Sequence, residues 1–146
     1  MQEEKHIAGL LEVKRNLENV LKDPEGLLPH QRLLMAGLSL GMQHMIELWL
    51  HKSRAIKPGA SIKHEWLASE ERRLKIRLAG ALTKQLETIK NSDKVLSLAR
   101  DVERDRNDII YGAPLTSDRI LKLKIEAFLE LKKAVEESIG EALWQD

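Results

Sequence analysis

The 146-residue chain has no cysteine and almost no excess of charge of either sign. The lack of cysteine excludes disulfide bonds, thiolate metal sites and a cysteine nucleophile. The 24 Lys and Arg residues are offset by 23 Asp and Glu residues, which gives a formal net charge of +1. The chain as a whole therefore offers no electrostatic attraction for nucleic acid or for a membrane, and such binding would need a local patch.

Several patterns with a defined function are also missing from the sequence. No apolar run approaches the length that crosses a bilayer, and the N-terminal "MQEEKHIAGL" lacks the basic start and unbroken apolar stretch of a signal peptide. There is no Gly-rich phosphate loop, no serine nucleophile elbow and no HExxH sequence. We therefore expect a cytoplasmic protein with no membrane association, no cofactor and no bound metal.

The residues that are abundant are helix formers. Leucine far outnumbers valine, and alanine, glutamate, lysine and arginine make up much of the rest. Apolar and polar residues nowhere alternate for long enough to predict a strand. The length suits one domain with a continuous core. We expect a single all-α domain over residues 1–146, folded as an antiparallel bundle of about five helices.

The first two expected helices cover residues 3–22 and 30–52. The first has one apolar face and ends at "DPEGLLP", whose prolines and glycine cannot all lie inside a helix. The second is the most apolar, so we expect it at the centre of the bundle. Its Gly37 and Gly41 predict a smooth strip where another backbone approaches closely.

The other three helices are expected over residues 69–90, from "NSD" to Gly112, and from "TSDR" onward. Ser69 and Ser117 are the expected N-caps. Gly112 suits a helix end, and Pro114 blocks continuation of the helix. Because short loops join long amphipathic helices, neighbouring helices should be antiparallel.

Histidines and basic residues supply candidate sites outside these helix signals. His44 and His51 lie seven residues apart with Glu47 between them, a set that can hold a metal. The Glu-x-x-His spacing of metal sites in helical bundles is absent, so we interpret this set as a polar helix edge. In "IKHEWL" we expect a helix start anchored by Trp66 rather than a catalytic His64. The basic "EERRLKIR", residues 70–77, could contact phosphate, but a solvated helix face with internal ion pairs is the simpler expectation.

The polar stretch "ERDRNDIIYGAP" has two interpretations. The first is a helix C-terminus in which the arginines complement the helix dipole, two isoleucines are buried and a glycine ends the helix. If the last turn loosens, Arg106 and Tyr111 would instead share one groove, flanked by Asn107 and Asp108.

The second interpretation is favoured by a family resemblance. Arg106-Asn107-Asp108, followed by "YGAPLTSDRILKLKIEAFLELKKAVEE", resembles the HEPN family of small prokaryotic helical domains, which often have a minimal nucleotidyltransferase as partner. That family's signature is an arginine, then a polar residue and, a few residues later, a histidine, near the end of a core helix and before a final long helix. The long apolar second helix, the proline loop and "KHEWL" are also similar to the family.

The resemblance implies a homodimer with the two motifs facing one groove. In family members that cut RNA, the Arg and His promote metal-independent attack of a ribose 2′-OH on the adjacent phosphate. Here Arg106, Asn107, Asp108 and Tyr111 become the candidate catalytic residues, with Tyr111 at the position of the family's histidine. A tyrosine with a pKa of about 10 is scarce as a base at neutral pH, but it can donate a hydrogen bond or stack on a base. The resemblance also implies that a partner enzyme could modify its hydroxyl.

Two classes of function therefore remain open. One is a metal-independent RNase or RNA-binding protein, acting as the toxin of a toxin–antitoxin pair with a nucleotidyltransferase antitoxin. The other is a catalytically inactive helical module that binds a nucleotide, RNA or a nucleotidyltransferase partner through the same groove.

Overall fold

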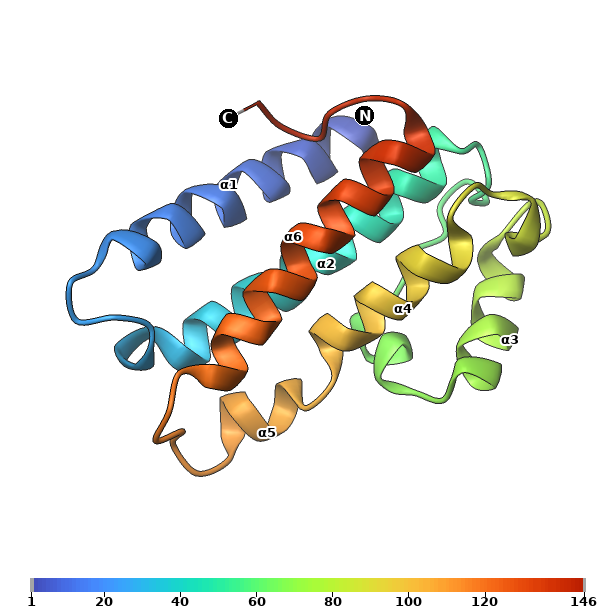
Figure 1. Cartoon of the computed structure of the whole chain (residues 1–146). Coiled ribbons are helices and arrows are strands. Elements are labelled where there is room, and N and C mark those ends of the chain that lie inside the picture. Colours follow the sequence, from blue (N-terminus) through green and yellow to red (C-terminus); the bar gives the residue numbers. More distant parts are fainter. Residues whose placement is uncertain (1, 146) are drawn as a thin grey trace.

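A computed structural model describes residues 2–145, and this part of the chain is all-helical (Figure 1). The only β-type pairing within it is an isolated bridge between Ile56 and Leu82. The all-α expectation is confirmed. The elements are α1 (Gln2–Lys22), η1 (Leu28–His30), α2 (Gln31–Lys52), η2 (His64–Ala68), α3 (Glu71–Ala81), η3 (Leu86–Thr88), α4 (Ser92–Glu103), α5 (Arg106–Tyr111) and α6 (Arg119–Ile139), where η marks a short 3-10 helix.

The central element is α2, which contacts α1, α4, α5 and α6. Helix α1 runs antiparallel to α2 and α4 runs antiparallel to α6, whereas α2 and α6 point the same way (Figure 1). The core between them includes fully buried Trp49, Met42 and Phe128. The expected central position of the most apolar helix is therefore correct, and the antiparallel arrangement holds for two pairs of helices but not for α2 and α6.

The two glycines of α2 have different surroundings. A Cβ added to Gly41 would lie 2.7 Å from the ring of Phe128 and 3.0 Å from Val13, so α1 and α6 both approach the backbone here. A Cβ added to Gly37 would meet nothing within 4 Å. Close packing against a neighbouring helix is confirmed for Gly41, and the same expectation for Gly37 is wrong.

The third helix is shorter than its apolar spacing predicts, because it ends at Ala81 rather than near residue 90. The Ala81 carbonyl accepts a hydrogen bond from the Lys57 amide at 2.9 Å, and the Thr83 amide donates to Ala55 at 2.7 Å. These long-range bonds flank Leu82, which is held in an extended conformation. Ser69 is not the N-cap of α3, since its hydroxyl donates to the Trp66 carbonyl of η2 at 2.5 Å.

The fourth expected helix is broken in two. Helix α4 ends at Glu103, Asp105 has a left-handed backbone with φ of 64°, and α5 begins at Arg106. The buried Lys124 of α6 donates hydrogen bonds to the carbonyls of Asp101 and Arg104, which are left free by the break. Burial lowers the pKa of this lysine. The break turns the chain at the point where the candidate site lies.

Helix α5 is held against α2 at its far end. The Nε of Arg32, in the first turn of α2, donates to the Ile110 carbonyl at 3.0 Å. The side-chain oxygen of Gln31 accepts a hydrogen bond from the Leu115 amide at 2.8 Å. Both ends of this short helix are thus fixed by contacts from elements distant in sequence.

Residues Leu28–Lys52 are long enough and apolar enough to cross a membrane by length and composition alone. The expectation that no segment approaches this length is therefore wrong. Within the protein, however, 67% of the most apolar window of this segment is buried. Such burial is what the core helix of a water-soluble protein shows.

Candidate functional site

A buried carboxylate lies at the break between α4 and α5. Glu103, the last residue of α4, accepts a hydrogen bond from the Ser39 hydroxyl of α2 at 2.5 Å. Its other oxygen accepts a hydrogen bond from Nδ1 of His64, in η2, at 3.0 Å. A buried carboxylate is costly unless it is hydrogen-bonded or paired. Glu103 therefore depends on α2 and η2, and it brings His64 to the start of α5.

Arg106 lies beside this carboxylate with part of its donor capacity unused. Its Nε is 3.8 Å from Oε1 of Glu103, close enough for attraction but too long for a hydrogen bond. One terminal nitrogen donates to the side-chain oxygen of Asn107 at 2.8 Å. The buried Nε has no hydrogen-bond partner among residues 2–145, while the side chain as a whole is 20% exposed. Because this Nε is enclosed, an incoming oxygen can reach only the terminal nitrogens of the guanidinium, one of which is held by Asn107.

These side chains line a cleft of about 180 Å³. A cleft of this size suits one small polar group, such as a phosphodiester, rather than a whole nucleotide. Its lining combines a guanidinium and an imidazole with several carboxylates. Only the part of the cleft beside the guanidinium and the imidazole therefore suits an anion. The lining residues are His64, Glu65, Ala68, Glu103, Asp105, Arg106, Asn107 and Asp108.

Three of the four sequence candidates meet at this cleft. Arg106, Asn107 and Asp108 line it. Tyr111, the last residue of α5, is not among the lining residues, and its side chain is 77% exposed. Five residues along a helix turn a side chain by about 140°, so Arg106 and Tyr111 face different directions. Within one chain the phenol is therefore not part of the cleft.

His64 is the site residue that the sequence analysis assigned to a helix start. The structure places it in η2, with its imidazole on Glu103. The feature of the sequence that could have indicated a partner such as His64 is Glu103, which follows Val95, Ala99 and Val102 on the buried face of α4. An acid at a core position needs a partner, and histidine or arginine is the usual one.

A second buried histidine–carboxylate cluster joins α1 to α2. His6 Nε2 lies 2.9 Å from a Glu47 oxygen, and His6 Nδ1 lies 3.0 Å from Nδ1 of His44. The other oxygen of Glu47 accepts a hydrogen bond from the Ile62 amide at 2.6 Å. Burial lowers the pKa of both His6 and His44. No three metal-ligating side chains in the described part of the chain converge on one point, here or elsewhere.

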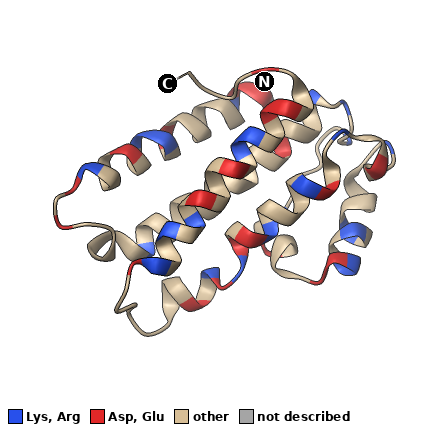
Figure 2. Ribbon diagram, viewed as in Figure 1, with Lys and Arg blue, Asp and Glu red and all other residues tan. Residues whose placement is uncertain are grey.

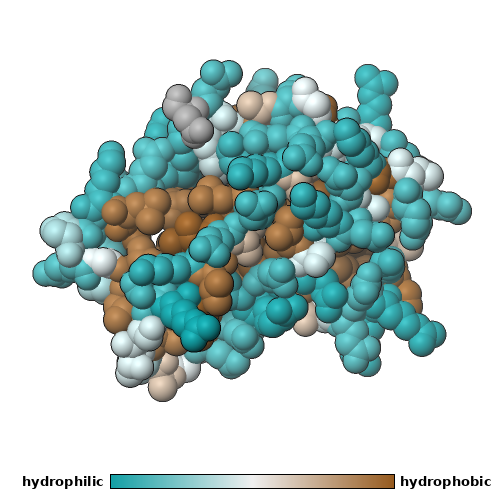
Figure 3. Space-filling model, viewed as in Figure 1, coloured by the Kyte–Doolittle hydropathy of each residue, from teal (hydrophilic) through white to brown (hydrophobic). Residues whose placement is uncertain are grey.

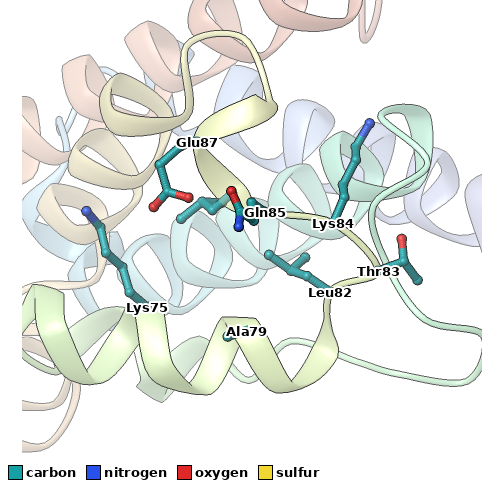
Figure 4. A pocket seen from close by; sticks show the side chains of 8 residues that line it. Lys75, Ala79, Leu82, Thr83, Lys84, Gln85 and Glu87 are labelled. Carbon is teal, nitrogen blue, oxygen red and sulfur yellow. The ribbon is translucent and has the colours of Figure 1, made fainter.

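A larger cleft, of about 360 Å³, lies between α3 and residues 82–87. Lys75 reaches toward Glu87 across it, while Lys84 points away (Figure 4). The lining residues that are buried, Leu82 and Leu86, are apolar. This cleft has no buried polar group that could orient a reaction, so it is a surface groove rather than a candidate active site.

Comparisons with protein-family models, with curated proteins and with solved structures found no match. The candidate site is therefore interpreted from the geometry and chemistry of this chain.

Proposed function

We propose that this protein, which resembles the HEPN family, cleaves RNA without a metal at the cleft between η2 and α5. The observation that carries the proposal is the convergence of His64, Glu103 and Arg106 from three separate elements on one cleft. An imidazole beside a guanidinium restores the pair of groups that the HEPN resemblance implies, although this histidine comes from another part of the chain.

Arg106 suits the phosphate in this reaction. Its guanidinium is always charged and offers several donors in a plane, which matches the oxygens of a phosphodiester. Negative charge accumulates on those oxygens in the transition state, and fixed donors that face this charge lower the barrier. Of its two terminal nitrogens, one donates to Asn107 and the other forms no hydrogen bond with the described residues.

His64 suits the role of general base. When the ring is neutral and its Nδ1 donates to Glu103, Nε2 is unprotonated; Nε2 lies 3.6 Å from an oxygen of Glu65, too far for a hydrogen bond. Nε2 takes the proton of a ribose 2′-OH, and the 2′-oxygen forms a bond to the adjacent phosphorus. The bond from phosphorus to the 5′-oxygen breaks, that oxygen takes a proton from water, and the hydroxide that remains takes the proton from His64. The products are a 2′,3′-cyclic phosphate and a free 5′-OH. Glu103 orients the imidazole, as a carboxylate does in other catalytic triads.

We also propose a homodimer, as the HEPN resemblance implies. Apolar side chains are exposed between α1 and α6 on the face shown in Figure 3. Leu33, in the first turns of α2, is 82% exposed, and Ile120 and Leu123 are exposed on the first turn of α6. Contiguous exposed apolar surface often marks a protein–protein interface. Light scattering at micromolar concentration should report a dimer, and a sole species of 16.7 kDa would contradict this arrangement.

The test of the RNase is cleavage of single-stranded RNA in the presence of EDTA. The natural chain should yield fragments that end in a 2′,3′-cyclic phosphate. Arg106→Ala should abolish cleavage and leave the melting temperature within a few degrees, because Arg106 makes no hydrogen bond to Glu103 and donates only to its neighbour Asn107. If the natural chain leaves RNA intact, or if Arg106→Ala cleaves normally, this function is wrong.

The exposed hydroxyl of Tyr111 favours a second candidate function. In that case the chain is an inactive module whose Tyr111 is modified by a nucleotidyltransferase antitoxin. A neighbouring gene for such an enzyme would support the pair. Tyr111→Phe would then abolish modification, whereas base stacking by the ring would survive. Tyr111→His tests the family motif directly, because an imidazole there should raise RNase activity if a partner copy brings it to the cleft.

A further inference from the structure

The solvent-facing side of α3 carries three exposed arginines. Leu74, Leu78 and Ala81 make the buried side of this helix. Helical periodicity spreads the arginines over an arc of about 140°, with Arg72 and Arg77 at its edges and an exposed isoleucine and a glycine between them. We call this surface the α3 arginine face, and it consists of Arg72, Arg73, Ile76, Arg77 and Gly80.

This composition does not help α3 to fold. Arg73 and Arg77 are four residues apart, and like charges at that spacing destabilise a helix. In residues 2–145, none of the three arginines forms an ion pair with a carboxylate. The expected internal ion pairs are present only between Lys75 and Glu71.

Gly80 also does not contribute to the stability of α3. Glycine weakens a helix relative to alanine. Here a Cβ would meet nothing within 4 Å, so no close packing needs the glycine. Together with the exposed Ile76 it makes a flat, partly apolar strip between charged side chains. Local departures of this kind gathered on one face point to a binding surface.

The face begins next to the candidate cleft. Ala68, the last residue of η2, lines the cleft, and Arg72 follows four residues later, so at most about 14 Å of chain separates them. Helix η2 contacts both α3 and α4, so it links the start of α3 to the break at the end of α4 (Figure 1). Figure 2 shows the Lys and Arg positions along α3.

The cleft itself cannot hold an RNA strand by charge. Its lining has one arginine against four carboxylates, those of Glu65, Glu103, Asp105 and Asp108. Protein affinity for single-stranded nucleic acid depends mainly on Lys and Arg contacts to phosphates. If RNA is the substrate, which is the function proposed above, the cations that hold its backbone must lie outside the cleft.

We infer that the α3 arginine face binds the backbone of single-stranded RNA next to the phosphate that enters the cleft. The three guanidiniums contact successive phosphates, Ile76 lies against a sugar or base, and Gly80 lets the backbone come close. The inference rests on the proposed RNA substrate but assigns binding, not chemistry, to α3.

The test is a salt titration of RNA binding. The triple variant Arg72→Ala, Arg73→Ala, Arg77→Ala is compared with the natural chain by fluorescence anisotropy. The probe is a labelled single-stranded 2′-O-methyl RNA, which cannot be cut by 2′-OH attack. The slope of log K against log[salt] should shrink by about 2, since each phosphate contact on a single strand contributes about 0.7. The control triple variant is Arg15→Ala, Lys22→Ala, Lys133→Ala, which removes equal charge from exposed positions on α1 and α6. It should keep the slope of the natural chain.

Four results would overturn the inference: no RNA binding by the natural chain, an unchanged slope in the α3 variant, an equal loss in both variants, or tighter binding of duplex DNA. Failure of the proposed function looks different. If the natural chain binds the probe through α3 but never cleaves unmodified RNA, the α3 binding surface is supported and the RNase function is wrong. If the natural chain cleaves RNA and the α3 variant does so with the same KM, the RNase function is supported and the α3 binding surface is wrong. Since all three arginines are exposed, both variants should melt like the natural chain.

Discussion

Two buried carboxylates in this protein each hold a histidine, and their surroundings differ in one respect. Glu47 is enclosed, and the side chain of its partner His6 is only 5% exposed. Glu103 is as deeply buried, but its partner His64 is 30% exposed, and Arg106 lines a cleft with an unpaired Nε. A buried His–Glu pair is therefore not in itself a site. What distinguishes the Glu103 cluster is access, because its histidine is partly exposed and lines a cleft together with Arg106.

The largest expected effect on stability is at the enclosed cluster. Glu47→Ala removes the acceptor of the Ile62 amide and of His6, and each buried donor left unpaired costs about 1–3 kcal/mol. Glu103→Ala should cost less, because His64 can turn toward water and the Ser39 hydroxyl can rotate. For RNA cleavage the order should reverse, with the larger loss in Glu103→Ala. Urea unfolding and RNA cleavage of the two variants check this, and the same order in both assays would remove the distinction between the clusters.

The second prediction concerns the two glycines of α2. Gly41→Leu should destabilise the fold by at least about 1 kcal/mol, because the new side chain overlaps Phe128 and Val13. Gly37→Leu should be nearly neutral, since that position faces open space. Thermal melts of both variants make the comparison. Equal melting temperatures would mean that α1 and α6 do not close over Gly41.

The sequence predicts the fold only where local signals determine the limits of a helix. The limits of α2 and the start of α6 follow from apolar spacing and local turn residues, which are properties of neighbouring positions. The end of α3 and the break at Asp105 do not, because both depend on distant partners: the Ala55–Thr83 backbone pairing and the Lys124 side chain on the α4 carbonyls.

The candidate site was likewise predicted only in its local part. Arg106, Asn107 and Asp108 were identified as a local motif, whereas His64 reaches Glu103 from 39 positions away in the sequence. A contact of that range has no local pattern, and only the buried acid in α4 indicates that a partner exists.

The smallest expected effect is the pH dependence of stability. Burial lowers the pKa of His6 and His44 in the folded protein, so both histidines bind protons more readily when unfolded. Stability is therefore fully present above the unfolded pKa of about 6.5 and falls as the pH drops below it. Melts between pH 8 and pH 5 should show this fall, and His44→Gln should reduce it. A fall of the same size in both proteins would place its origin elsewhere.

The central claim is that His64, held by Glu103, acts with Arg106 on RNA. The most direct measurement is the single-turnover rate of RNA cleavage in EDTA for His64→Gln, with His51→Gln as the matched histidine outside the cleft. Loss of a general base lowers a rate by about 10²–10⁴-fold. We predict a loss of this size for His64→Gln, with His51→Gln at the rate of the natural chain. A His64→Gln rate equal to that of the natural chain would contradict the claim.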